Sequence, residues 1–340
     1  MTKLQTYKFS TTSVRYYLSS AFSQLKKIAD RKTAILVTDE NVYNAHPAIF
    51  EAWNTIIIEP GEQHKLQTTA DDIIEELVSI EAGRDNLLIG VGGGVVTDMT
   101  GYVASVYLRG IPFGFIPTSL LGMVDASIGG KNGVDVGVYK NMVGTIRQPD
   151  FILQDTALLQ TLPEEEWQNG FAEIIKHACI KDAVMFRELE ARSVSDFMQN
   201  KKLLDNLIER NMVLKTRIVQ RDEFEKNERR LLNFGHTLGH ALENLHQIKH
   251  GHAVSIGMAA ASLFSEKLVG FKNRERIHSL LEKYGLPVSF PFDKEKVLDV
   301  LRHDKKRVRK EINYVLLERI GKAVIKPIPL QKLDKMISSL

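Results

Sequence analysis

The chain has 340 residues, enough for two domains with a sizeable buried core. Its hydrophobic share of 44% and charged share of 26% are those of an ordinary soluble globular protein, and the net charge of +3 gives no general reason to expect a nucleic-acid partner. A single cysteine, Cys179, excludes an internal disulfide and fits a reducing cytosol.

No membrane segment is expected. The N-terminus lacks the apolar core of a signal peptide. The longest apolar stretch, 111–130, contains two prolines and Asp125, so it does not suit a bilayer span. We therefore expect a soluble, cytoplasmic protein that binds neither membrane nor nucleic acid.

The first half alternates short apolar runs with helical patterns. Continuous apolar runs at 33–39, 54–60 and 86–94 predict parallel strands buried on both faces, and 68–83 between them has helical periodicity. Further strands are predicted at 112–120 and 150–155. This alternation predicts an α/β domain over 1–160, with a doubly wound, mostly parallel, Rossmann-like sheet.

The second half is predicted to be a mainly α-helical domain over 161–340. Apolar residues recur at helical spacing in 161–182, 194–220 and 252–270. The segment 312–325 is the exception and predicts a small hairpin that turns near Gly321.

Polar and glycine-rich turns follow three of the predicted strands. Gly92–Gly94 stands between a strand and a helix, where backbone N–H groups can bind a phosphate. The spacing is not GxGxxG, so a glycine turn needed only for packing stays an alternative. Asp39 and Asn41 follow the first strand, and Glu62 and Lys65 the second, where they could bind the same nucleotide.

A glycine-rich loop concentrates Asp125, Lys131, Lys140 and Asn141 among apolar residues. Lysine in such surroundings favours an anionic ligand, although a solvated loop lysine is the alternative, above all for Lys140. The basic run 302–310 is interpreted either as a solvated turn or as a phosphate contact.

Five histidines lie within 229–252. On a helix, His236, His240 and Glu243 share one face, opposite an apolar face. Because neutral imidazole is the commonest metal ligand in proteins, this pattern favours a metal site, with a run of core or solvated histidines as the alternative.

Six ordered motifs make the chain resemble the 3-dehydroquinate synthase family, within the wider group of sugar phosphate cyclases. The motifs are GGGVVTD, PTSLLGMVDASIGGKNGVD, KNMVG, GFAEIIKH, RRLLNFGHTLGH and HGHAVSIGM. The resemblance implies conversion of 3-deoxy-D-arabino-heptulosonate 7-phosphate to 3-dehydroquinate and phosphate, a step of the shikimate pathway towards aromatic amino acids. It also implies NAD and a divalent metal, Zn2+ or Co2+, as cofactors, and a homodimer.

The resemblance further implies a role for individual residues. It makes Glu173, His236 and His250 the metal ligands, so that His240 becomes a catalytic residue instead of a ligand. The catalytic residues it implies are Lys131, Lys215, Glu225 and His240. The substrate contacts it implies are Arg109, from the neighbouring subunit, with Asp125, Asn141, Lys176, Arg229, Asn233, Lys305 and Lys306. The NAD contacts it implies are Asp39, Asn41, Glu62, Lys65, Gly93, Gly94, Val95, Asp98, Thr118, Ser119, Lys131, Lys140 and Thr161.

One departure from the family is visible at His252, where the family commonly has glutamate in the motif HGE. Two alternatives to the implied activity stay open. One is a sibling cyclase whose sugar phosphate lacks a carboxylate, and the other is a metal-dependent polyol dehydrogenase.

Overall fold

The computed structural model describes residues 2–137, 139–302, 307–308 and 311–340. The chain forms two compact units. The first consists of Met1–Trp167 and Lys201–Phe224, and the second of Gln168–Asn200 and Glu225–Leu340. The chain therefore passes from one unit to the other three times.

The first unit contains a seven-stranded sheet in the order β1-β2-β9-β6-β5-β3-β4, in which only the β1–β2 pair is antiparallel. The strands predicted from apolar runs are all present in this sheet. The seven strands are β1 (Lys3–Lys8), β2 (Ser13–Leu18), β3 (Ala34–Asp39), β4 (Asn54–Ile58), β5 (Leu87–Gly92), β6 (Phe113–Pro117) and β9 (Phe151–Leu153).

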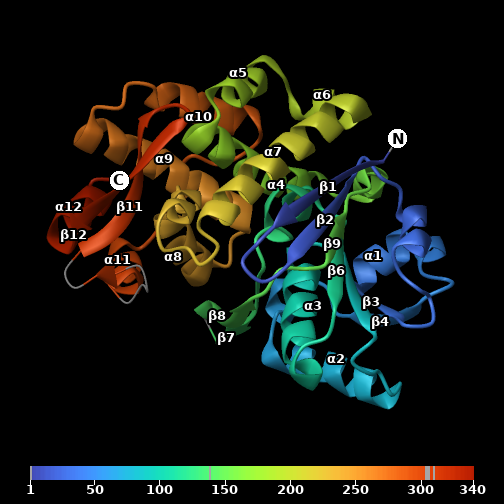
Figure 1. Ribbon diagram of the computed structural model, residues 1–340. Coiled ribbons are helices and arrows are strands. Elements are labelled where there is room, and N and C mark those ends of the chain that lie inside the picture. The colour runs from blue at the N-terminus through green and yellow to red at the C-terminus, as the bar shows by residue number, and fades with distance from the viewer. Residues whose placement is uncertain (1, 138, 303–306, 309–310) are drawn as a thin grey trace. The chain divides into compact units, whose positions relative to one another are not determined.

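Helices cover both faces of this sheet, which confirms the predicted doubly wound α/β fold. One face packs against α2 (Gln67–Ser79), α3 (Gly94–Val106) and α7 (Lys201–Arg221). The other face packs against the short helices η1 (Phe22–Lys27), η2 (Pro47–Ile49) and η6 (Thr156–Thr161), together with α1 (Glu40–Ala45). Figure 1 shows α3 lying alongside the parallel strands.

A hairpin of β7 (Lys131–Val136) and β8 (Tyr139–Ile146) was not predicted. It covers α3, and the hydroxyls of Thr145 and Ser105 lie 3.1 Å apart. Three short helices complete this unit: η3 (Glu62–His64), η4 (Tyr107–Arg109) and the π-helical turn η5 (Gly122–Ala126).

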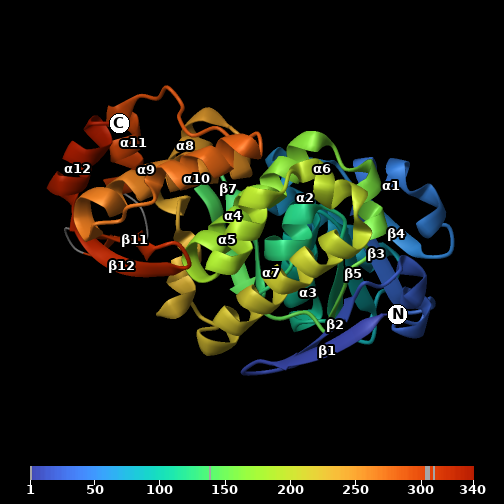
Figure 2. The ribbon, with the colours of Figure 1, turned by 90° about the horizontal axis from the view of Figure 1, so that it is seen from above.

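The second unit is mainly helical, as predicted. In it, α9 packs against α8, α10 and strand β11 (Figures 1 and 2). Its helices are α4 (Glu164–Lys181, which begins at the boundary), α5 (Ala183–Ala191), α6 (Val194–Gln199), η7 (Glu228–Asn233), α8 (His236–His246), α9 (His250–Val269), α10 (Arg274–Lys283), α11 (Lys294–Arg302) and α12 (Leu330–Ser338). Its small antiparallel sheet consists of β10 (Arg307–Val308), β11 (Glu311–Arg319) and β12 (Lys322–Pro329). Gly321 adopts a positive φ of 81° in the β11–β12 turn, so the predicted hairpin is confirmed.

The division of the chain differs from a single boundary at residue 160 because α7 belongs to the first unit. Met212 of α7 is fully buried in the same core as Tyr16 of β2, and the Thr216 hydroxyl donates to the Tyr16 hydroxyl at 3.3 Å. Burying a side chain such as Met212 contributes about 2 kcal/mol. Met212, with Val213 packed beside it, thus places part of the apolar face of α7 in the core of the sheet.

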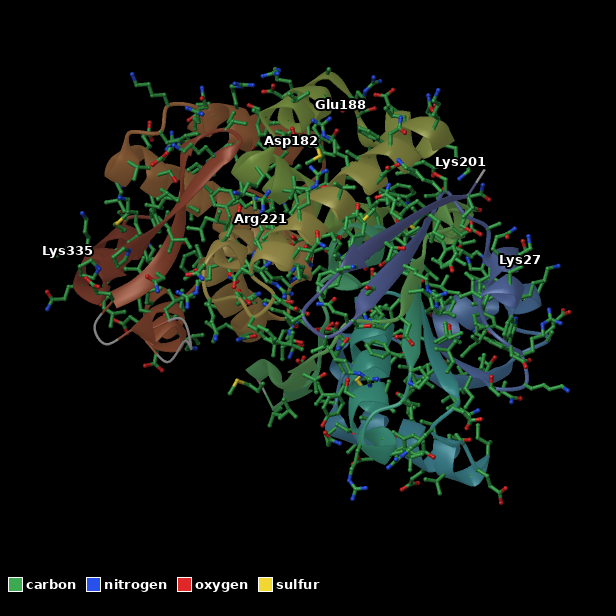
Figure 3. All side chains as sticks on the ribbon, viewed as in Figure 1. Lys27, Asp182, Glu188, Lys201, Arg221 and Lys335 are labelled. Atoms are coloured by element: carbon green, nitrogen blue, oxygen red, sulfur yellow. The ribbon has the colours of Figure 1, made fainter. Side chains whose placement is uncertain are left out.

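Charged side chains, among them the exposed Lys27, Lys201 and Lys335, project from the units into solvent (Figure 3). Within the described ranges, no helix is both long enough and apolar enough to cross a membrane.

Candidate functional site

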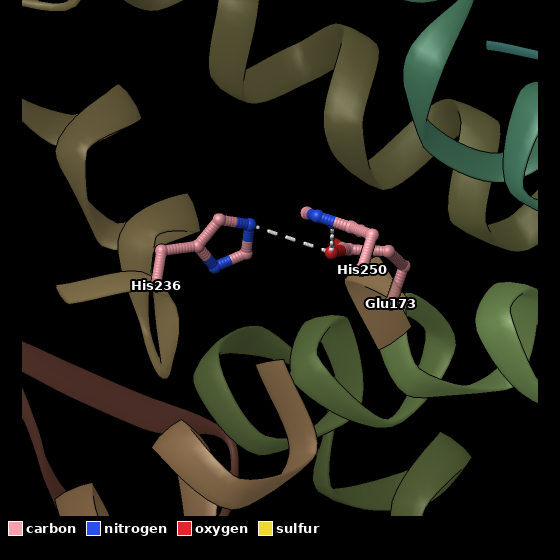
Figure 4. Close-up of side chains that lie close together, drawn as sticks. All are labelled: Glu173, His236 and His250. Atoms are coloured by element: carbon pink, nitrogen blue, oxygen red, sulfur yellow. Dashed lines mark hydrogen bonds and ion pairs between the residues drawn. The ribbon is translucent and has the colours of Figure 1, made fainter. Parts of the chain in front are cut away.

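Three side chains from three helices converge in the second unit. Glu173 lies in the middle of α4 and is fully buried, while His236 and His250 are the first residues of α8 and α9. Their ligand atoms all lie within 4.8 Å of one another (Figure 4). We refer to these three residues as the metal triad, since two imidazoles and one carboxylate form a common catalytic zinc site.

Two glycines permit the helix contacts that assemble the triad. A Cβ atom at Gly257 of α9 would lie only 1.8 Å from the carbonyl oxygen of Gly235, directly before His236. A Cβ atom at Gly251 would lie 2.6 Å from the Cα atom of Asn169 on α4. The Gly251 N–H also donates to the Asn169 side chain at 2.9 Å. Only glycine lets α9 approach both neighbours this closely.

Both imidazoles direct Nε2 towards the same oxygen of Glu173. The distance to Oε1 is 3.4 Å from His236 and 3.0 Å from His250. Nδ1 of His236 lies 3.1 Å from the carbonyl oxygen of Phe234, which accepts a hydrogen bond only if Nδ1 carries the proton. In that tautomer, the Nε2 lone pair of His236 is left for a metal ion.

Burial and neighbouring charges set the protonation of the triad. Burial works to raise the pKa of Glu173, but the Lys176 ammonium, His236 and the histidine hydrogen bonds outweigh it and hold this pKa well below its usual range. Burial and Lys176 lower the pKa of His236. Burial also works to lower the pKa of His250, but Glu243 and Glu173 outweigh it and raise this pKa to about 10.

Lys176 and Glu173 form an ion pair one turn apart on α4, and both side chains are almost completely buried. Lys176 is one of the substrate contacts that the resemblance implies. Because Lys176 pairs with Glu173, its positive charge lies next to the metal triad. This charge would attract a substrate anion and would repel a metal ion.

His240 and Glu243 extend the polar face of α8, as the helical spacing predicts. The His240 ring centroid lies 5.0 Å from that of His236. His240, Glu243 and His250 form a second group with ligand atoms within 4.8 Å. Glu243 lies on this face, as the spacing predicts, and is not among the residues to which the resemblance gives a role.

The segment before α8 contains further predicted substrate residues. The Asn233 amide donates to Glu225 Oε1 at 2.6 Å, and Arg229 is 2% exposed. His252 lies on α9 with Nε2 3.4 Å from the side-chain oxygen of Gln168 on α4. The structure thus gives His252 a neighbour across the α4–α9 contact.

In the first unit, several predicted NAD residues contact one another. The buried Lys65 amine donates to Asp98 at 2.5 Å and to Asn141 at 2.7 Å. Lys140 lies 3.4 Å from Glu62. These contacts bring the β4–α2 loop, α3 and the β7–β8 hairpin together.

Other predicted NAD residues lie at the carboxyl ends of β3, β5 and β6. Asp39 accepts from the Val42 N–H at 3.0 Å and so caps α1. Gly93 is the N-cap of α3, and a Cβ atom there would meet the Ser119 hydroxyl at 3.5 Å. The Thr118 N–H donates to the Gly92 carbonyl at 2.9 Å. Gly94 and Val95 open α3 beside them.

The remaining predicted residues are spread over several elements. The Lys215 amine lies 2.9 Å from the carboxylate of Asp125, and the Thr161 hydroxyl lies 2.8 Å from His46. Exposed positions are held by Asn41, Arg109 and Lys131. Lys305 and Lys306 lie outside the described residues.

Comparisons with known proteins agree on one family. Family models for the N-terminal and C-terminal parts of 3-dehydroquinate synthase match residues 55–169 and 170–307. The chain is 42% identical over 287 residues to a 3-dehydroquinate synthase of Pyrococcus abyssi, a match that covers 84% of this chain and 85% of that protein.

Solved structures of two other synthases share the fold. A 2-epi-5-epi-valiolone synthase from Streptomyces hygroscopicus, with NAD+ and Zn2+ bound, is 26% identical at a TM-score of 0.88, covering 99% of this chain and 98% of that chain. A 2-deoxy-scyllo-inosose synthase complexed with carbaglucose-6-phosphate, NAD+ and Co2+ is 22% identical at a TM-score of 0.86, covering 99% of this chain and all of that chain.

Replacing Glu173 with Gln should abolish stoichiometric zinc binding and leave the fold intact, because the amide keeps the side-chain shape but loses the anionic ligand. Elemental analysis of the dialysed protein and circular dichroism measure these two outcomes. Glu190→Gln is the matched control, since it removes the carboxylate paired with Arg276 in the same unit. Unchanged zinc content in Glu173→Gln would exclude Glu173 as a ligand.

Metal binding should release about one proton near neutral pH. Glu173 and His236 enter the reaction deprotonated because their pKa values are lowered, whereas His250 is protonated below its raised pKa of about 10. The affinity for Co2+ should therefore rise about tenfold per pH unit up to that pKa. Titration calorimetry in buffers of different ionisation enthalpy measures the proton count, and a count near zero would contradict this protonation pattern. His246→Gln, at an exposed position of α8, should leave the count unchanged.

Proposed function

The chain belongs to the 3-dehydroquinate synthase family, and on that premise we propose that it converts 3-deoxy-D-arabino-heptulosonate 7-phosphate to 3-dehydroquinate and phosphate. The enzyme would be a carbocycle-forming phosphorus–oxygen lyase that depends on NAD and a divalent metal, Zn2+ or Co2+. Because the thiol of Cys179 is buried and free of a disulfide, the proposal includes a cytoplasmic location.

The observation that carries the proposal is the convergence of the metal triad. It occurs within residues 55–307, which the two family models match. When bound, the metal and NAD+ would supply the transient oxidation of a substrate alcohol to a ketone, which makes the neighbouring C–H acidic enough for phosphate to leave by β-elimination before the ketone is reduced again. Ring opening and an intramolecular aldol addition of the substrate would then close the carbocycle.

Protein groups would hold and orient the reactants. Glu173 and the two Nε2 atoms provide an open three-ligand set of the kind found in catalytic zinc sites. The glycine turn at Gly93 and Gly94, at the start of α3, would accept the cofactor phosphates, because glycine leaves the backbone N–H groups approachable. Asp39, at the end of β3, is the carboxylate proposed for a ribose hydroxyl.

Basic side chains of the second unit are proposed as contacts for an anionic substrate. Arg229 is 2% exposed, and Lys176 is 1% exposed and pairs with Glu173. The proposed substrate carries a carboxylate and a phosphate. His240, with its ring beside the triad, is proposed as the residue that moves a proton to and from the substrate.

Two alternatives remain in view. A sibling cyclase would act on a sugar phosphate without a carboxylate, so the contact proposed between Arg229 and a substrate carboxylate would not form. A polyol dehydrogenase would accumulate NADH. The proposed reaction, in contrast, is redox-neutral.

We also propose a homodimer formed through an apolar patch of the first unit. Val106, Leu108 and Ile146 are each more than 40% exposed, and the Ser105–Thr145 contact joins the segments that contain them. Arg109 follows directly, in the position that the resemblance assigns to the neighbouring active site. Sedimentation equilibrium should give twice the chain mass, and Leu108→Glu should shift the mass towards the monomer. A monomer at every concentration would contradict the dimer.

The activity itself is tested by phosphate release. The purified protein with NAD+ and Zn2+ should release phosphate from 3-deoxy-D-arabino-heptulosonate 7-phosphate without net NADH, and a chelator should abolish the release. Glucose 6-phosphate serves as the control substrate that lacks a carboxylate. Phosphate from glucose 6-phosphate alone would favour a sibling cyclase, and NADH accumulation from polyols without phosphate release would favour the dehydrogenase.

A further inference from the structure

His250 is held at both ring nitrogens. Its Nε2 lies 3.0 Å from Glu173 Oε1, and its Nδ1 lies 3.5 Å from Glu243 Oε2. Glu243 is 5% exposed and belongs to none of the roles described above. A buried carboxylate therefore faces the nitrogen of His250 that points away from the triad.

We propose that Glu243 is a positioning residue for the metal centre, accepting a hydrogen bond from Nδ1–H of His250 and so keeping the Nε2 lone pair directed at the metal ion. The inference rests on the metal site of the proposed function. It assigns Glu243 no contact with the metal or the substrate.

The chemistry of imidazole gives the reason. A neutral imidazole carries its proton on one nitrogen only, and a metal can bind only the other. An acceptor opposite Nδ1 therefore selects the tautomer that binds through Nε2, and such outer partners typically change metal affinity 10- to 100-fold. For His236 that acceptor is the carbonyl of Phe234, which no side-chain substitution removes. For His250 it is a side chain, so the effect can be measured.

The helix geometry favours positioning over direct ligation by Glu243. Glu243 follows His236 by seven residues on α8, which separates them by about 10 Å along the helix axis. It thus reaches His250 from the far side of the ring. Direct ligation would use the second group, His240, Glu243 and His250, and would require a metal on the Nδ1 side of His250.

The test compares Glu243→Leu, which removes the acceptor, with Glu243→Gln, which keeps a neutral acceptor. Competition with a chromophoric chelator, repeated across pH, measures the Co2+ dissociation constant of the full-length protein, and the values for deprotonated His250 are compared so that proton competition does not enter. We expect Glu243→Leu to weaken Co2+ binding 10- to 100-fold at unchanged one-to-one stoichiometry, with Glu243→Gln in between. The visible Co2+ absorption spectrum should keep its shape in both variants, because the ligands are unchanged. Glu190→Leu and Glu190→Gln are the matched controls and should bind like the unmodified protein.

Each outcome decides the proposal. Binding by Glu243→Leu within twofold of the unmodified protein overturns it. A Co2+ spectrum altered in Glu243→Gln shows a lost ligand and overturns positioning in favour of direct ligation. If Glu243→Leu does not fold, Glu243→Gln decides alone, together with the 15N shifts of His250, which should show Nδ1–H and metal-bound Nε2 in the unmodified protein. If the unmodified protein does not bind Co2+, the metal site itself is rejected. If the unmodified protein and the Glu243 variants bind Co2+ equally well, only the positioning role of Glu243 is rejected.

Discussion

The site depends on one constraint, the compensation of a fully buried carboxylate at Glu173. An ionised carboxylate away from water is stable only among cations and hydrogen-bond donors. Lys176 meets this need from the same helix, and His236 and His250 meet it from the starts of two others. Because those helices must begin beside α4, the close approaches at Gly251 and Gly257 follow from the same requirement. The contacts between α4, α8 and α9 that bury Glu173 are therefore the same contacts that bring the three residues of the metal triad together.

Much of the fold could be predicted because its signals are local. The strands β3, β4 and β5 are apolar runs, and such runs have few other interpretations; β3 and β5 are buried on both faces, whereas the edge strand β4 is buried on one face only. The missed elements lack that signal. β1 is largely exposed, and β7–β8 contains glycine and charged residues, so antiparallel pairing within a hairpin, and not an apolar run, defines them. The periodicity of α7 predicts a helix but not the core on which it packs, since either core would bury the same apolar face.

The spacing of residues predicts only part of the candidate site, and the resemblance to the family predicts more of it. Spacing on one helix gathers His236, His240 and Glu243, but it contains no information on α4 or α9. The triad therefore came from the resemblance, and the structure brings its three members together. The contact between Glu243 and His250 depends on how two helices cross, so neither spacing nor motif predicts it.

Because the chain returns to the first unit at α7, the two units cannot be divided at one point of the sequence. The first unit is completed only after the chain has already built α4, α5 and α6 of the second. A fragment that stops near residue 160 would leave Tyr16 and the sheet face around it without Met212 and Thr216. Neither unit is a continuous stretch of chain, so no single cut of the chain yields either unit whole.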